Sequence, residues 1–314
     1  MGSHLEGAYA TTLARMKAQK GSRSRLGIEA LMWVSNSERP LHTSELCHAL
    51  GVKIGSPDLN VENIPTIRTL LGCSLGLITV EASSSTARLV HFSLQEYICN
   101  SPGLFRSPHT MIAEVCLAYL NFESVRDLSP TLRSAPSTVP LVGYASRYWG
   151  RHMRREKVKR VNSLSLRLLV GFEQHIASHL LLLSYYEDIC DTRWWELGFD
   201  GRNGPKGFTG LHGGAFFGMV DIVAALLAMK KWDVNAADIT GKTALVWAAV
   251  RGHDGVVGLL LEREDISSNT TGTGYCQAPL LLATGGGHEG VAKLLLKREG
   301  IDSVRNGAVR PSCG

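Results

Sequence analysis

The sequence lacks the cysteine patterns of zinc-binding and disulfide-stabilised proteins. Its cysteines lie scattered at positions 47, 73, 99, 116, 190, 276 and 313, and none forms a Cys-x-x-Cys pair. An odd and scattered set of seven cysteines indicates neither a structural zinc site nor a disulfide framework. Such cysteine usage is typical of a reducing compartment. We therefore predict a cytoplasmic protein without a bound metal.

Long apolar runs and catalytic motifs are also missing. The longest apolar stretch, residues 164–186, is interrupted by Arg167 and by the polar residues 173–175, so it falls short of a membrane span. His175 and His179 are spaced to share a helix face, but no His-Glu-x-x-His motif or carboxylate pattern accompanies them. No Ser/His/Asp set or paired carboxylates can be placed. We predict no membrane insertion, no enzymatic activity, no cofactor and no small-molecule substrate.

Net charge is only mildly basic, with 33 basic and 28 acidic residues. The basic residues concentrate in one segment, 147–160, which lies mostly within a predicted helix over 141–159. They are Arg147, Arg151, Arg154, Arg155, Lys157, Lys159 and Arg160. Such a run can contact acidic partners or nucleic acid, but residues spread over all faces of a helix are more typical of a solvated surface. Nucleic-acid binding therefore stays open as an alternative.

A repeat with a period of 34 residues occupies the C-terminal third. Residues 207–212 (GFTGLH) recur as 241–246 (GKTALV), and Leu226-Leu227 recurs as Leu260-Leu261. A third copy follows from residue 278 at a spacing of 35. A fixed period of this size predicts stacked helical units that bury their apolar faces against one another. Such arrays usually serve as binding surfaces.

The middle copy resembles the ankyrin repeat. Residues 238–249 (DITGKTALVWAA), Gly252-His253 and 256–261 (VVGLLL) carry the resemblance. In ankyrin arrays the turn tips and first-helix faces line a concave surface, so the resemblance implies that a protein partner binds there. The residues at these positions are Lys206, Asp238, Thr240, Lys242, Val246, Trp247 and Arg251. We expect Trp247→Ala with Arg251→Ala to weaken partner binding without unfolding the array.

A second pattern overlaps the same repeat. Residues 236–243 (AADITGKT) fit a relaxed phosphate-loop motif, which would place Lys242 on a nucleotide phosphate and Thr243 on magnesium. That motif requires a buried strand directly before it, and residues 230–235 (KKWDVN) do not form one. The repeat register accounts for every residue of the segment. We therefore interpret it as a structural turn.

The N-terminal region has the element order of a winged helix. Helical patterns cover residues 5–20, 26–34, 43–50 and 64–71, and β-type runs cover 77–81 and 87–92. A short extended piece at 39–42 precedes the third of these helices, and we expect Pro65 in the first turn of the fourth. Winged helices that read DNA do so with the last helix before the hairpin. Here that helix offers only Arg68 among apolar residues, which argues against base recognition.

The region from residue 5 to 122 is similar to the segment that follows the nucleotide-binding NACHT domain in fungal NOD-like proteins of the STAND class. The motifs 89–97 (LVHFSLQEY) and 112–120 (IAEVCLAYL) carry much of this resemblance. It implies that the winged helix packs on a nucleotide-binding domain and that His91 senses a nucleotide phosphate, if such a domain lies upstream or acts in trans. Otherwise His91 is an ordinary histidine at a strand end. We find neither the phosphate loop nor the magnesium motif of that domain.

Together these patterns predict a mainly α protein in three parts. We expect a winged-helix domain with a small β-hairpin at 5–122, a helical bridging region at 123–200 and an ankyrin-repeat solenoid at 201–314. The expected function is a non-catalytic protein–protein interaction module, a fragment or relative of a fungal NOD-like receptor. The alternative is a nucleic-acid-binding protein that uses the wing and the basic segment 147–160.

Overall fold

The computed structural model describes residues 2–156, 162–188, 206–267 and 278–298. The chain divides into two compact units. Unit 1 comprises residues 1–127 and 134–161, and unit 2 comprises residues 128–133 and 162–314. The region 123–200, which we expected to be a separate bridge, contributes to both units. The boundary expected at residue 200 lies outside the described residues.

Unit 1 contains a winged helix, as the sequence predicts. Its helices are α1 (Gly2–Lys17), α2 (Ser22–Asn36), α3 (Thr43–Gly51), the short 3-10 helix η1 (Val61–Asn63), α4 (Ile67–Cys73), α5 (Phe92–Cys99), α6 (Pro108–Leu120), α7 (Glu123–Arg126) and α8 (Leu141–Arg155). Its strands are β1 (Leu41–His42), β2 (Ile78–Glu81) and β3 (Thr86–Leu89). They form an antiparallel sheet in the order β1-β3-β2, in which β2, β3 and the turn between them form the wing.

Two local predictions in this unit are wrong. Pro65 does not lie in the first turn of α4, because the hydroxyl of Thr66 accepts the Thr69 N–H and makes Thr66 the N-cap. The second β-type run ends at Leu89, because His91 caps the following helix α5. His91 is therefore a helix N-cap and not a residue at the end of a strand.

A close approach between α2 and α4 anchors the winged helix. A side-chain carbon at Gly27 of α2 would lie 2.6 Å from the Cys73 carbonyl oxygen at the end of α4, so only glycine fits there. The amide Nε2 of Gln19 donates to the same oxygen at 2.7 Å. Trp33 of α2 is buried beside Tyr144 of α8. The apolar faces of these helices therefore share one core.

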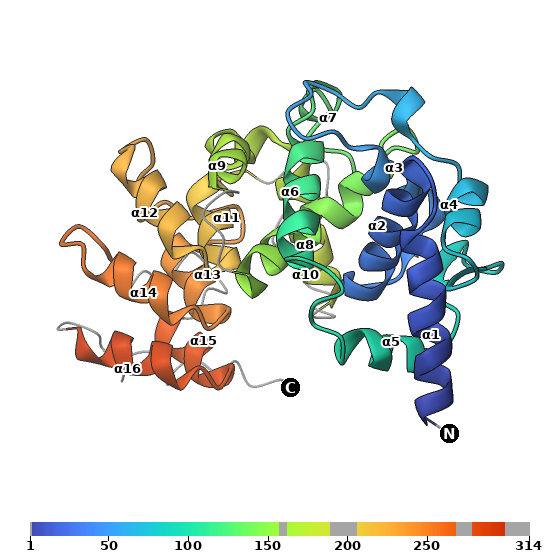
Figure 1. Cartoon of the computed structure of the whole chain (residues 1–314). Helices are drawn as coiled ribbons and strands as arrows, with labels where there is room; N and C mark the ends of the chain where they lie inside the picture. The colour runs from blue at the N-terminus through green and yellow to red at the C-terminus, as the bar shows by residue number, and fades with distance from the viewer. Residues whose placement is uncertain (1, 157–161, 189–205, 268–277, 299–314) are drawn as a thin grey trace, which may run out of the picture. The chain divides into compact units, whose positions relative to one another are not determined.

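Unit 2 is an array of paired helices. It contains α9 (Asn162–Val170), η3 (Phe172–Gln174), α10 (Ile176–Asp188), α11 (Gly210–Phe217), α12 (Val220–Ala228), α13 (Ala244–Val250), α14 (Asp254–Leu261), α15 (Pro279–Gly285) and α16 (Glu289–Lys297). The pairs α11/α12, α13/α14 and α15/α16 follow one another from yellow to red in Figure 1. The first helices of neighbouring pairs pack together, as the ankyrin resemblance implies. Helix α9 packs against the first pair.

The repeat in the sequence reappears as a repeat of backbone geometry. Gly252 has φ +68°, and a side-chain carbon there would collide with the ring of His288. In the second and third repeats the turn glycine is followed by a histidine that reaches back to the preceding pair. His253 Nε2 donates to the Phe216 carbonyl at 2.9 Å, and His288 Nε2 donates to the Val250 carbonyl at 3.0 Å. The Gly-His motif therefore joins the second repeat to the first and the third repeat to the second.

Candidate functional site: the inner face of the repeats and a pocket beside the wing

The last turn of α10, the loop before α11 and the helices α11 and α13 together supply an aromatic cluster, which we define as Tyr185, Tyr186, Phe208, Phe216 and Trp247. Trp247 of α13 lies at its centre, with its ring centroid 5.0 Å from that of Tyr185, 5.4 Å from Phe216 and 5.7 Å from Phe208. The rings of Tyr185 and Phe208 meet it nearly perpendicularly. Edge-to-face contacts of this kind are favourable beyond the area they bury. The last turn of α10 thus covers part of the inner face of the repeats.

Asp238 organises the turn that precedes α13. One carboxylate oxygen accepts hydrogen bonds from the backbone N–H and hydroxyl of Thr240, at 2.8 and 2.6 Å, and from the Lys242 N–H at 3.1 Å. The other accepts the indole Nε1–H of Trp247 at 2.7 Å. Four donors therefore satisfy a carboxylate that is only 5% exposed. The function that this geometry supports for Asp238 is to hold the turn and the indole in place.

Four of the residues that we expected on the accessible concave surface are buried. Asp238 and Thr240 are each 5% exposed, and Val246 and Trp247 are fully buried. The expectation that these residues present an accessible surface is wrong for this structure. The polar groups of Asp238 and Thr240 are hydrogen-bonded within the turn, and the aromatic cluster surrounds the indole of Trp247. Their assigned role in partner binding stays a prediction.

The remaining three predicted residues are accessible to different degrees. Lys206 is exposed, while Lys242 and Arg251 are half-buried. Lys242 Nζ donates to the Tyr186 hydroxyl at 3.0 Å and lies 5.2 Å from the Trp247 ring centroid. The Arg251 guanidinium carbon lies 4.7 Å from the Phe216 ring centroid. Both cations thus rest against aromatic faces, an arrangement that stabilises them while keeping their charge.

The same contacts bear on the phosphate-loop pattern. Residues 230–237 form turns and loop, not a buried strand, and α13 after the pattern spans only Ala244–Val250. Thr243 caps α13 by accepting the Val246 N–H, and the ammonium of Lys242 is directed at the Tyr186 hydroxyl. This geometry supports the structural interpretation of the segment.

Burial shifts two ionisation equilibria beside the inner face. Burial raises the pKa of the Tyr185 phenol, and the nearby charge of Lys242 opposes that shift. Burial lowers the pKa of His212, whose Nε2 donates to the Ala236 carbonyl at 3.1 Å. Both groups are therefore kept in their neutral forms around neutral pH.

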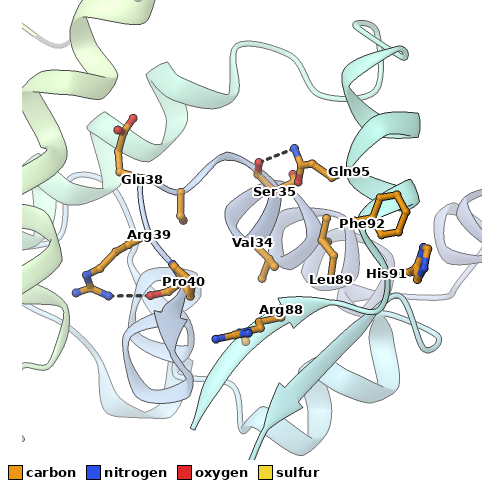
Figure 2. Close-up of a pocket in the computed structure, with 12 residues that line it drawn as sticks. Val34, Ser35, Glu38, Arg39, Pro40, Arg88, Leu89, His91, Phe92 and Gln95 are labelled. Carbon is orange, nitrogen blue, oxygen red and sulfur yellow. Dashed lines mark hydrogen bonds between the residues drawn. The ribbon is translucent and has the colours of Figure 1, made fainter. Parts of the chain in front are cut away.

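A second candidate surface is a pocket in unit 1 of about 540 Å³ (Figure 2). Its lining residues come from the end of α2, the loop before β1, strand β3 and the start of α5. They are Val34, Ser35, Ser37, Glu38, Arg39, Pro40, Ala87, Arg88, Leu89, His91, Phe92 and Gln95. Phe92 is 69% exposed at its rim, and the neighbouring Val90 is 49% exposed. The pocket is thus open and partly apolar.

His91 lies beside Phe92 at one side of this pocket (Figure 2). The two ring centroids are 4.3 Å apart. His91 Nδ1 accepts the Ser93 N–H at 3.2 Å and lies 2.7 Å from the Ser93 hydroxyl. One ring nitrogen therefore caps α5. The nucleotide-sensing role that the resemblance implies for His91 stays a prediction.

The pocket's arginines form ion pairs. Arg39 binds Glu45 through two hydrogen bonds of 2.8 and 2.6 Å, and Arg88 pairs with Glu81 at 2.7 Å. Glu38 pairs with Arg155 of α8 at 2.9 Å. These partners were missed by sequence reasoning, which treated the basic segment without its acidic counterparts. The signal available was the acidic residues 38 and 45 on either side of the extended piece at 39–42.

The structure also changes the interpretation of the basic segment. In α8 the residues Tyr144, Tyr148, Trp149 and His152 are buried, whereas Arg147 is half-buried and Arg151, Arg154 and Arg155 are exposed. The arginines therefore form a stripe and are not spread over all faces. Arg147 and Arg151 both lie over the Tyr148 ring, at 5.3 and 5.4 Å. Lys157, Lys159 and Arg160 lie outside the described residues.

The described residues also bear on metal sites and membrane spans. No group of three or more His, Cys, Asp or Glu side chains is placed to hold a metal ion within residues 2–156, 162–188, 206–267 and 278–298. His175 Nδ1 accepts the Ala177 N–H at 3.0 Å, so it acts in the local turn. In the same parts of the chain, no helix combines the length and apolar character needed to cross a membrane.

Comparison with known proteins identifies both halves of this architecture. A family model described as ankyrin repeats in three copies matches residues 180–271 and 211–307. A second model, described as the winged helix domain of GPI inositol-deacylase, matches residues 13–107. A search of curated proteins finds no match. The chain therefore combines a winged-helix domain with ankyrin repeats, and the repeats support a role as a protein-interaction module.

Proposed function

We propose that this chain is a non-catalytic interaction module whose ankyrin repeats bind a protein partner through their inner face. The observation that carries the proposal is the stack of three helix pairs with Lys206, Lys242 and Arg251 at accessible or half-buried positions. Lys242 lies on the Trp247 ring and Arg251 lies on the Phe216 ring. A partner with acidic side chains would complement this surface.

The finer proposal concerns the origin of the module. We infer a relationship to fungal NOD-like receptors from the motif around His91 and from the order of a winged helix followed by ankyrin repeats. The match to a winged helix domain model supports the fold of the first part. In such a receptor the pocket beside the wing would face a nucleotide-binding domain, and His91 and Phe92 would lie at that contact. The cysteine usage is in keeping with action in the cytoplasm.

Nucleic-acid binding is less well supported by the geometry. Helix α4 carries one exposed arginine, Arg68, and the arginine stripe lies on α8 instead of the helix that would enter a groove. Arg155 is already paired with Glu38. Binding of generic duplex DNA that weakens steeply with salt would favour this alternative.

Charge reversal tests the proposed surface. We expect Lys206→Glu with Arg251→Glu to weaken binding at least tenfold, about 1.4 kcal/mol, to a partner identified by cross-linking the full chain in its source cells. Calorimetry with purified proteins measures the affinity, and circular dichroism checks the fold. The matched control is Lys293→Glu, because Lys293 is exposed on the outer helix α16. Equal binding by both variants would place the partner on another face.

A further inference from the structure

The end of α1, the start of α2 and the turn between them carry basic side chains with no acidic residue among them. Residues 7–28 contain five basic residues and no aspartate or glutamate. The basic residues are Arg15, Lys17, Lys20, Arg23 and Arg25, and all five are exposed. In the part of the chain that the structure describes, only Arg25 of these forms an ion pair, with Glu29 at 3.9 Å. The segment therefore presents a concentrated positive charge to solvent.

Hydrogen bonds fix this turn against the neighbouring helices. The Ser24 hydroxyl donates to the Lys17 carbonyl at 3.0 Å and so joins the start of α2 to the end of α1. Gln19 Nε2 donates to the Cys73 carbonyl at 2.7 Å and so joins the turn to the end of α4. The backbone of the turn is therefore held in place, and its cations are arranged by the fold.

Helix α4 adds a further cation to the same surface. One guanidinium nitrogen of Arg23 lies 3.9 Å from the position that a side-chain carbon at Gly72 of α4 would occupy. Arg68 lies one helical turn before Gly72, on the same face of α4, and is exposed. Helices α1, α2 and α4 lie together in Figure 1. We define the basic surface as Lys17, Lys20, Arg23 and Arg68.

The side chains beside these cations are small and polar. Ser22, Thr69 and Gly72 are exposed. Among the described residues, none of the exposed large apolar side chains lies between residues 6 and 53 or between residues 62 and 89. Protein interfaces are usually centred on aromatic or aliphatic anchors, and membrane-bound surfaces insert apolar side chains into the lipid. Basic groups accompanied by hydroxyls are instead the combination that contacts nucleic-acid phosphates.

We propose that the basic surface binds the phosphate backbone of duplex nucleic acid without reading its sequence. Lysine and arginine contacts to phosphates release counterions, and this release supplies affinity without apolar contact. The surface uses neither base recognition by α4 nor the arginine stripe of α8. The single arginine on α4 then acts as a phosphate contact, and the lack of base-reading side chains explains why no sequence is preferred. This binding is independent of the protein partner of the ankyrin repeats.

The salt dependence of DNA binding by the full chain tests the proposal. We expect the logarithm of the association constant for a labelled duplex of about 20 base pairs to fall with the logarithm of salt concentration with a slope of about −3.6, since each of four cations contributes about −0.9. Fluorescence anisotropy measures the binding. Lys20→Gln/Arg23→Gln should change the slope to about −1.8 and weaken binding at least tenfold at about 0.1 M salt. Two duplexes of unrelated sequence should bind equally well.

Two matched double variants remove the same charge elsewhere. Lys293→Gln/Lys297→Gln alters exposed lysines of α16, and Arg151→Gln/Arg154→Gln alters exposed arginines of α8. Both should keep the slope and affinity of the unaltered chain, and the second separates this proposal from binding through the arginine stripe. Circular dichroism checks that each variant is folded.

Three results would overturn the proposal. One is a loss of DNA binding by either matched variant equal to that of Lys20→Gln/Arg23→Gln, because net charge or α8 would then account for the binding. Another is binding that does not depend on salt. The third is tighter binding to vesicles of anionic lipid or to poly-glutamate than to the duplex, which would assign the basic surface to a membrane or to an acidic protein segment.

Discussion

The pocket beside the wing and the inner face of the repeats are both candidate surfaces, but one is open and the other is filled. Phe92 at the rim of the pocket is 69% exposed, whereas Trp247 on the inner face is fully buried. Phe92 lies within the motif 89–97, and Trp247 lies within the ankyrin-like motif 238–249. The difference teaches that a repeat position identifies which side chains share a face, while burial depends on whether another segment covers that face.

The two surfaces also hold their cations differently. Arg39 and Arg88 at the pocket are neutralised by carboxylates, whereas Lys242 and Arg251 on the inner face rest on rings. An aromatic ring stabilises a cation without cancelling its charge. The ring contact thus leaves the positive charge of Lys242 uncancelled, whereas the arginines of the pocket are matched by carboxylates.

The largest effect is expected from removing the indole at the centre of the aromatic cluster. We expect Trp247→Ala to lower the free energy of unfolding of the repeats by about 3–5 kcal/mol, because it deletes a buried indole and leaves Asp238 without one of its donors. Denaturant unfolding followed by circular dichroism measures the loss. The comparison variant Arg251→Ala should cost about 1 kcal/mol or less, as expected for a half-exposed cation–π contact. Equal costs would contradict the assignment of Trp247 to the core.

We expect low pH to destabilise unit 1 through a buried hydrogen-bonded chain that begins at Glu38 of the pocket lining. The Glu38 N–H donates to the Tyr144 hydroxyl at 3.1 Å, and that hydroxyl lies 2.8 Å from His152 Nε2, while His152 Nδ1 lies 2.9 Å from His109 Nδ1. Burial, then the neighbouring His109 and Arg155, lower the pKa of His152 to about 3 from its ordinary value of 6.5. Between about pH 3 and pH 6.5, His152 is therefore protonated in the unfolded chain but neutral in the folded chain.

The resulting stability is complete above about pH 6.5 and falls as the pH decreases from 6.5 towards 3. We expect His152 alone to contribute a slope of at most about 1.4 kcal/mol per pH unit in this window. Unfolding of unit 1 at several pH values measures it. The variant His152→Gln should be less stable at pH 7 but show a flatter profile. A variant with the same slope as the unaltered chain would assign the acid sensitivity to other groups.

The smallest effect is expected at the rim of the pocket. Phe92→Ala should change the free energy of unfolding by no more than about 0.5 kcal/mol, because the side chain is largely exposed. Thermal unfolding measures this, with Leu94→Ala as the buried comparison in the same helix α5. A large loss at Phe92 would show that the pocket is closed in solution.

Periodicity was enough to predict the architecture, because each repeated glycine, histidine and leucine has a local structural role. The order of helices and strands in the winged helix also followed from apolar patterns and turn residues. Contacts between residues distant in sequence could not be predicted in the same way. Tyr185 and Trp247 are 62 positions apart, and no local pattern shows that they meet. The sequence therefore placed Trp247 on the correct helix but on an accessible surface.

The histidines that join neighbouring repeats limit how the length of this array can change. His253 contacts a carbonyl 37 residues earlier, and His288 contacts one 38 residues earlier. Recombination between equivalent points of two repeats preserves every such donor and its acceptor, whereas an insertion inside a helix separates them. Duplication or loss of whole repeats is consequently the mildest change in length, and the array can vary its reach in evolution in steps of one repeat.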